Sequence, residues 1–227
     1  MLKLVHYLRD SKHLSTLYTF LVLLCSVWGI ILLILRILNS DHFLNAFVAT
    51  LVFFTTQSNI LVLVVTLFFL LKFHYKKWFN YLSFIALVNI FITGLIFNTI
   101  LGPFMGKLDL IQYVLHTINP VLYIMLYYIF MPTKIDHKYF FIGILFPVFY
   151  IISVYYFIEP FLGNYILNAF NEFDISRFVY PFLDPMNYKS YPKGTLFFVL
   201  FALGLSVSIL SFLLNLLKNK LENSMFK

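Results

Sequence analysis

Six apolar runs in this chain are each long enough to cross a bilayer. A transmembrane helix needs about 20 apolar residues, because the hydrocarbon core is about 30 Å thick and a helix rises about 1.5 Å per residue. The runs are continuously apolar rather than alternating, which favours helices over a membrane barrel. They cover residues 14–38, 44–71, 80–101, 110–131, 138–160 and 195–217. The sequence therefore predicts an all-α membrane protein with six transmembrane helices in one integral membrane domain, 1–227.

Composition excludes several other classes of protein. Of the 227 residues, 62% are hydrophobic and 11% are charged, whereas about 25% are charged in a typical soluble domain. The net charge of +7 bears on topology and lipid headgroups, because no soluble basic region remains to bind nucleic acid. Cys25 is the only cysteine, and no two histidines have a helical zinc-ligand spacing. We therefore expect no disulfide, no metal site and no cofactor.

The positive charges predict the orientation of the chain. Lysine and arginine concentrate on the cytoplasmic flanks of membrane helices. Eleven of the 16 lie at the termini or in the loops after the second and fourth runs, and Lys218 and Lys220 belong to this flank. The other five are Arg36, Lys107, Arg177, Lys189 and Lys193. This bias predicts a multi-pass protein of the cell membrane with both termini in the cytoplasm. The long loop 161–194 then lies outside.

Two polar clusters interrupt the apolar runs. The second run contains Phe54-Thr55-Thr56-Gln57-Ser58-Asn59, in which Thr55, Ser58 and Asn59 share one helix face. The fourth run carries a polar and aromatic stripe around His116, namely Gln112, Asn119, Pro120, Tyr123 and Tyr127. Thr55 lies about 15 Å and His116 about 9 Å from the outer ends of their helices, from the rise per residue. We expect both clusters in the same leaflet.

Other polar residues have both an ordinary and a functional interpretation. Asn89 and Thr93, four residues apart in the third run, could complete a polar lining or hold helices together. Pro120 has no N–H for the His116 carbonyl, so we expect a kink that opens space beside the imidazole. Asp184 in the long loop could be a solvated carboxylate or could help to orient His116.

The two clusters together could perform nucleophilic chemistry. A hydroxyl is a poor nucleophile unless a base takes its proton, and imidazole is the natural base near neutral pH. Thr55 and His116 could fill these two roles, while Asn59 or Asn119 could donate to a developing oxyanion. The more ordinary interpretation is that the same polar groups serve helix packing.

Three motifs in the chain resemble the family of the androgen-induced protein and the androgen-dependent TFPI-regulating protein. They are Phe54-Thr55-x-Gln57-Ser58-Asn59, His116-Thr117-x-x-x-Pro120 and Tyr180-Pro181-Phe182-Leu183-Asp184. The resemblance covers nearly the whole chain, and the uncharacterised bacterial branch of six-span proteins is the most similar part of the family. Characterised animal members are membrane threonine hydrolases that cleave esters of fatty acids with hydroxy fatty acids.

The resemblance implies particular roles for residues of this chain. It makes Thr55 the nucleophile and His116 the base, with Thr56 the adjacent alternative to Thr55. Asp184 stands where animal members tend to have Glu. Related sequences carry an acidic residue nine or ten positions after the histidine, whereas this chain reads Met125-Leu126-Tyr127-Tyr128 there.

These observations lead to one preferred function and several alternatives. The preferred one is an intramembrane hydrolase of a lipid ester, with a membrane lipid or fatty-acid ester as substrate. Ser58, Asn59, Asn119, Tyr123, Asn89, Thr93 and Asp184 would support the site. A lipid-binding protein or small transporter could use the same lining without catalysis, and an acyltransferase would replace water with a hydroxyl acceptor. The substrate and the oligomeric state are not readable from the sequence.

Overall fold

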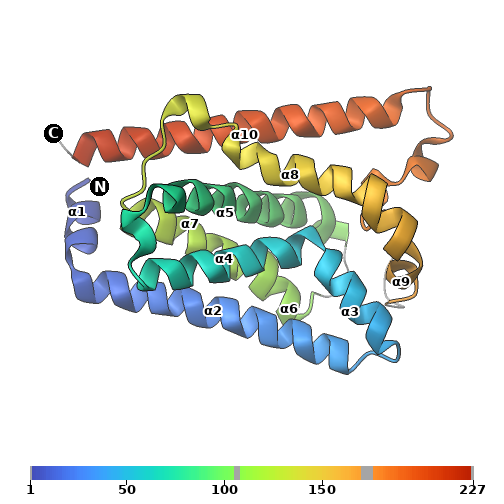
Figure 1. Cartoon of the computed structure of the whole chain (residues 1–227), viewed down its shortest axis with the longest axis horizontal. Helices are drawn as coiled ribbons and strands as arrows, with labels where there is room; N and C mark the ends of the chain where they lie inside the picture. Colours follow the sequence, from blue (N-terminus) through green and yellow to red (C-terminus); the bar gives the residue numbers. More distant parts are fainter. Residues whose placement is uncertain (1, 105–107, 170–175, 226–227) are drawn as a thin grey trace.

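The computed structural model describes residues 2–104, 108–169 and 176–225. All the regular structure in these ranges is helical, which confirms the predicted all-α class. Figure 1 shows a bundle of long helices with both termini at one end. That end is called the terminal end below. The opposite end, called the loop end, carries α3 (Phe43–Val52) and α9 (Gly163–Leu167).

Five helical segments are long and apolar enough to cross a membrane. They are Lys12–Leu38, Lys77–Leu101, Leu110–Phe130, His137–Leu167 and Thr195–Ser224. A sixth span is formed if the bent pair α3 and α4 (Phe54–Leu70) counts as one. The structure therefore contains the predicted membrane-length apolar helices, although the second predicted span, 44–71, is broken in two.

The first part of the chain runs to the loop end and returns through a broken span. Helix α1 (Leu2–Asp10) precedes α2 (Lys12–Leu38), which runs from the terminal end to the loop end. The prediction of one continuous helix over 44–71 was wrong, because the axes of α3 and α4 differ by 68°. Phe53 lies between them in an extended conformation, with φ −64° and ψ 131°. An apolar pattern does not reveal such a break, since both halves remain apolar.

The middle of the chain forms the packed centre of the bundle. Helix α5 (Lys77–Ile96) follows the short turn η1 (Phe73–Tyr75) and continues through the π-helical turn η2 (Phe97–Leu101) into η3 (Gly102–Phe104). Helix α5 is buried along much of its length, and the main apolar core surrounds it. Its neighbours in this core include α4 and α7 (Asn119–Met125).

The fourth span alternates between α-helical and π-helical turns. It consists of α6 (Leu110–Tyr113), η4 (Val114–Ile118), α7 and η5 (Leu126–Phe130). The π-helical turn η4 contains His116 and ends just before Pro120. Pi-helical turns often occur at functional sites, because they re-aim side chains within an otherwise regular helix.

The fifth span is longer than the sequence predicted. After η6 (His137–Tyr139), helix α8 (Ile142–Ser153) continues through the π-helical η7 (Val154–Leu162) into α9. The predicted limits were 138–160, so the first part of the expected loop 161–194 is helical. The loop then contains the short turns η8 (Pro181–Leu183) and η9 (Pro185–Tyr188).

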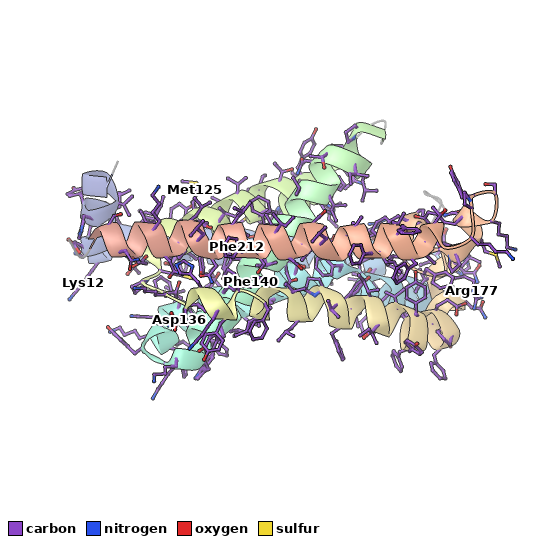
Figure 2. The ribbon with its side chains drawn as sticks, turned by 90° about the horizontal axis from the view of Figure 1, so that it is seen from above. Lys12, Met125, Asp136, Phe140, Arg177 and Phe212 are labelled. Carbon is purple, nitrogen blue, oxygen red and sulfur yellow. The ribbon has the colours of Figure 1, made fainter. Side chains whose placement is uncertain are left out.

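Helix α10 (Thr195–Met225) lies along the outside of the bundle and returns to the terminal end. It exceeds the predicted span 195–217 by eight residues. Figure 2 shows it across the front of the other helices, with Phe212 beside Phe140. The two rings meet edge to face with centroids 5.6 Å apart. Ser211 also donates to the Phe140 carbonyl at 2.6 Å.

A charged cluster, called the terminal cluster, joins three segments at the terminal end. Glu222 on α10 accepts two hydrogen bonds from Arg9, at 2.8 and 2.9 Å, and lies 2.9 Å from Lys218. Lys218 also donates to the carbonyls of Tyr127 and Met131, both at 2.7 Å. Lys218 is buried, although a flanking lysine would be expected on the surface. The cluster satisfies carbonyl groups at the end of the fourth span, which that helix cannot pair itself.

Candidate active site

A cavity of about 430 Å³ opens at the loop end, within the usual size range of small-molecule sites. Residues of α2, α4, α5, α8, α10 and the fourth span line it, together with loop residues 179–183. Most of these side chains are apolar. The polar ones are Arg36, Thr55, Thr56, Thr93, Gln112, His116, Tyr150 and Tyr180. Such a lining suits an apolar ligand with one polar region.

Thr55 and His116 meet at this cavity. The Thr55 Oγ1 lies 3.2 Å from the His116 Nε2, a separation that a proton can cross directly. Thr55 is the second residue of α4, and His116 lies in the middle of η4. Thr56 also lines the cavity but is buried, and Thr55 makes the contact with His116.

A backbone carbonyl orients the imidazole of His116. The Nδ1 lies 3.0 Å from the Gln112 carbonyl oxygen. A carbonyl only accepts, so Nδ1 carries the proton, and in a neutral ring Nε2 has a lone pair that faces Thr55. The ring also stacks on Phe97, with centroids 3.8 Å apart and planes 12° from parallel. The Gln112 carbonyl thus takes the orienting role for which the sequence offered no carboxylate in the fourth span.

Pro120 shapes the helix around His116. The carbonyl of His116 has no N–H partner at Pro120, and Asn98 supplies one at 2.9 Å. Gly94 allows α5 to come close here, because an added Cβ would lie 3.2 Å from that carbonyl oxygen. The missing hydrogen bond is therefore replaced from a neighbouring segment, and the turn at His116 is π-helical.

The break at Phe53 leaves backbone groups that side chains satisfy. Tyr150 on α8 donates to the Val52 carbonyl at 2.9 Å, and Gln57 donates to the Leu51 carbonyl at 3.1 Å. The backbone of Phe54 also interacts with the Tyr150 phenol oxygen. Backbone groups must be paired in this way within a membrane, because no bulk water is present. Gln57 thus has a structural role that its sequence position did not suggest.

The break also places the start of α4 at the cavity. No side chain caps α4 from its N-cap residue Phe53. The first N–H groups of a helix have no partner within it and favour negative charge nearby. Discontinuous membrane helices often direct such N-termini at anionic groups of a substrate. Here the phenol oxygens of Tyr150 and Tyr180 meet the first N–H groups of α4, next to Thr55.

Asn59 and Asn119, expected as oxyanion donors, are engaged away from the cavity. The Asn59 amide donates to the carbonyls of Thr55 at 2.9 Å and Leu115 at 3.1 Å. The Asn119 amide donates to Asn59 at 2.6 Å, and Ser26 donates to Asn119 at 2.9 Å. The network fixes the backbone beside Thr55 and His116 relative to one another. Its residues hold the site together rather than facing a ligand.

The other expected supporting residues have different positions. Ser58 donates to the Phe54 carbonyl, and Tyr123 donates to the Ser83 carbonyl, so both serve packing. Asn89 is fully buried with neither amide atom hydrogen-bonded. Thr93 lines the cavity, and its buried hydroxyl also has no hydrogen-bond partner.

Asp184 holds the loop and is not part of the cavity lining. Its carboxylate accepts from the Ser176 hydroxyl at 2.6 Å and from the Met186 N–H at 2.9 Å. The structure therefore brings together the nucleophile and base candidates but gives Asp184 no contact with His116.

Arg36 and Tyr180 are two lining residues that the sequence analysis did not select. Arg36 is near the end of α2, and its charge acts on His116. Tyr180 belongs to the Tyr180-Pro181-Phe182-Leu183-Asp184 motif, of which the sequence predicted only Asp184 as a site residue. Only proximity in three dimensions connects either residue with Thr55.

Comparison of the chain with protein-family models, curated proteins and solved structures finds no match.

Proposed function

We propose that this protein is an intramembrane hydrolase of lipid esters, with Thr55 as nucleophile and His116 as general base. The 3.2 Å contact between Thr55 Oγ1 and His116 Nε2 carries the proposal. It joins a hydroxyl to the lone pair of an oriented imidazole, beside a cavity of ligand size. Helix packing alone does not require a nucleophile and a base to meet at a cavity.

The reaction would proceed in two steps. Thr55 Oγ1 attacks the ester carbonyl carbon and its proton passes to His116 Nε2. The tetrahedral intermediate expels the alcohol oxygen, which takes the proton from Nε2 and leaves the acyl group on Thr55. Water then attacks this acyl-enzyme and gives a proton to Nε2. Collapse returns that proton to Thr55 and releases a carboxylic acid.

The lining of the cavity favours an ester with a long apolar chain and a negative charge. Apolar side chains of α5, α8 and α10 would surround the chain, including Ile92, Ile151 and Val207. Arg36 is the charged residue among the described lining residues, and it would attract an anionic group near the ester. A fatty acid ester of a hydroxy fatty acid has both features.

We also propose that the protein lies in the cell membrane with both termini in the cytoplasm. The termini share one end of the bundle, as an even number of spans requires. Lysine and arginine concentrate in the segments at that end, namely α1, the start of α2, the turn between α4 and α5, the turn before α8 and the last part of α10, as the positive-inside rule expects. The loop end and its cavity would then face the outer leaflet.

Labelling with an alkyl fluorophosphonate tests the hydrolase proposal. The purified wild type should be labelled covalently, and Thr55→Ala should remove labelling. Thr56→Ala is the matched control, because it deletes the neighbouring hydroxyl and should leave labelling intact. Mass spectrometry should place the adduct on Thr55.

Other outcomes would favour the alternatives. Labelling that persists in Thr55→Ala contradicts the proposed nucleophile. Lipid that co-purifies intact, with binding unchanged by Thr55→Ala and no labelling, indicates a lipid-binding protein or transporter. Transfer of the acyl group to an added alcohol in preference to water indicates an acyltransferase.

A further inference from the structure

Thr55 and His116 supply a nucleophile and a base but leave Tyr180 without a role. Its side chain lines the same cavity from the loop that follows α9. The phenol is within hydrogen-bonding reach of the Thr55 side chain and of the backbone at Phe54 and Thr55. Tyr180 is thus the part of the loop that approaches the reacting hydroxyl.

The proposed reaction requires a donor at this place. Attack by Thr55 puts negative charge on the former carbonyl oxygen of the ester, next to Thr55 Oγ1. The amides of Asn59 and Asn119 donate to other groups and face away from the cavity. The Tyr180 hydroxyl is already beside Thr55, where the charge would develop.

We propose that Tyr180 is a catalytic residue whose hydroxyl donates a hydrogen bond to the oxyanion formed on attack by Thr55. The inference rests on the proposed hydrolase function and adds a third group to the reaction. No proton is transferred from Tyr180, because the phenol only shares its hydrogen with the oxyanion until the intermediate collapses.

The surrounding hydrogen bonds prepare this phenol to donate. Tyr150 donates its own proton to the Val52 carbonyl, so in the hydrogen bond between the two phenols Tyr180 is the donor. N–H groups at the start of α4 approach the Tyr180 oxygen, which polarises its O–H bond. Burial raises the pKa of Tyr180, so the phenol keeps its proton at neutral pH.

The backbone next to Tyr180 is strained. Val179 has φ +70°, a left-handed conformation that β-branched residues rarely adopt. Such strain persists only where the surrounding structure holds it, and it is concentrated at functional sites. Here it sets the direction in which the chain presents Tyr180.

The segment after Tyr180 is fixed by side chains that donate to its carbonyls. Tyr155 donates to Leu183 at 2.6 Å, and Tyr188 donates to Phe182 at 2.9 Å. The Tyr180 ring stacks on Phe182, with centroids 5.3 Å apart. A donor held in this way is oriented before the substrate arrives, which is the condition for effective oxyanion stabilisation.

Tyr180→Phe tests the proposal, because it removes one oxygen and keeps the stacked ring. We would measure hydrolysis of p-nitrophenyl palmitate and the rate of fluorophosphonate labelling by the full-length protein. The expected result is a fall in kcat of about 10²- to 10³-fold with KM changed by less than about threefold. Tyr191→Phe, at an exposed phenol of the same loop, is the matched control and should behave like the wild type.

A trifluoromethyl ketone with a long alkyl chain separates catalysis from packing. It forms a tetrahedral oxyanion on the nucleophile, so Tyr180→Phe should weaken its binding by a factor similar to the fall in kcat. Binding of 1-hexadecanol, which carries no negative charge, should not change. A rise in KM with unchanged kcat would overturn the proposal and make Tyr180 a lining residue.

Fluorinated tyrosines at position 180 keep the test decisive if Tyr180→Phe folds poorly. They retain the phenol and increase its acidity, so kcat should rise with donor strength at a pH where each remains protonated. A kcat that does not depend on phenol acidity would contradict the proposal.

If turnover depends on Thr55 and the kcat of Tyr180→Phe equals that of the wild type, the role of Tyr180 is refuted and the hydrolase proposal stands. If the wild type has no Thr55-dependent turnover, the hydrolase proposal fails with it.

Discussion

The terminal cluster and the Thr55–His116 site are both polar groups inside an apolar bundle, but their surroundings differ. In the terminal cluster, Arg9 and Lys218 surround Glu222, and both also donate to backbone carbonyls. The Thr55–His116 pair faces a cavity of about 430 Å³. Polar groups that are fully paired with protein serve the fold, whereas paired groups beside open space can act on a ligand.

This difference gives opposite expectations for mutations at the two ends. At the terminal end, loss of one partner should damage stability more than activity, because it leaves a buried charge unpaired. At the loop end, loss of the base should damage activity more than stability, because it leaves no buried charge unpaired. Four measurements test this contrast.

His116→Gln should have the largest effect. Glutamine keeps a polar side chain but cannot take the Thr55 proton, so turnover and labelling should fall by about 10³-fold or more. The unfolding free energy should change by less than about 1 kcal/mol. Labelling rate and denaturant unfolding of the same preparation check both parts. If His116→Gln destabilised the protein but its folded molecules were still labelled at the wild-type rate, His116 would be a structural residue and not the base.

Glu222→Gln should destabilise the protein by about 3–5 kcal/mol, because Arg9 and Lys218 would lose their common counter-charge. The folded fraction should keep its labelling rate. The matched control is Lys138→Met, whose ion pair with Asp136 is exposed and 3.8 Å long, and it should cost less than about 1 kcal/mol. If both substitutions lowered the unfolding free energy equally, the buried cluster would stabilise the fold no more than an exposed ion pair does.

Arg36→Met should change substrate preference with little effect on the fold. Loss of a charged hydrogen bond should reduce kcat/KM about 10- to 100-fold for an ester with a free carboxylate. The corresponding methyl ester should be hydrolysed at an unchanged rate. Kinetics on the two esters provide the comparison, and an equal loss for both would remove Arg36 from substrate recognition.

Asn89→Leu should have the smallest effect, and it should raise the unfolding free energy rather than lower it. Both amide atoms of Asn89 are buried without partners, so an apolar side chain of similar size should stabilise by about 1 kcal/mol. Asn119→Leu is the contrasting control, because it removes bonds to Ser26 and Asn59 and should destabilise by about 1–3 kcal/mol. Loss of activity in Asn89→Leu would indicate that Asn89 binds a group that enters from the cavity.

The sequence by itself determined the helical class and most of the spans, because the need to bury backbone groups in an apolar medium leaves helices as the available structure. It also selected Thr55 and His116, since a hydroxyl and an imidazole are conspicuous within apolar runs. Asn59 and Asn119 were noticed for the same reason, but their hydrogen-bond partners were not readable from spacing.

Tertiary structure decided the break at Phe53, the orientation of His116 and the approach of Tyr180 to Thr55. The break depends on Tyr150, which comes from another helix and pairs with the Val52 carbonyl. The imidazole of His116 is oriented by a backbone carbonyl. Every residue has such a carbonyl, so the sequence does not identify the one that contacts His116. Tyr180 and Thr55 are 125 positions apart, and only the folded loop brings them together. A sequence pattern records what a side chain can do, whereas the partner that it meets depends on how distant segments pack.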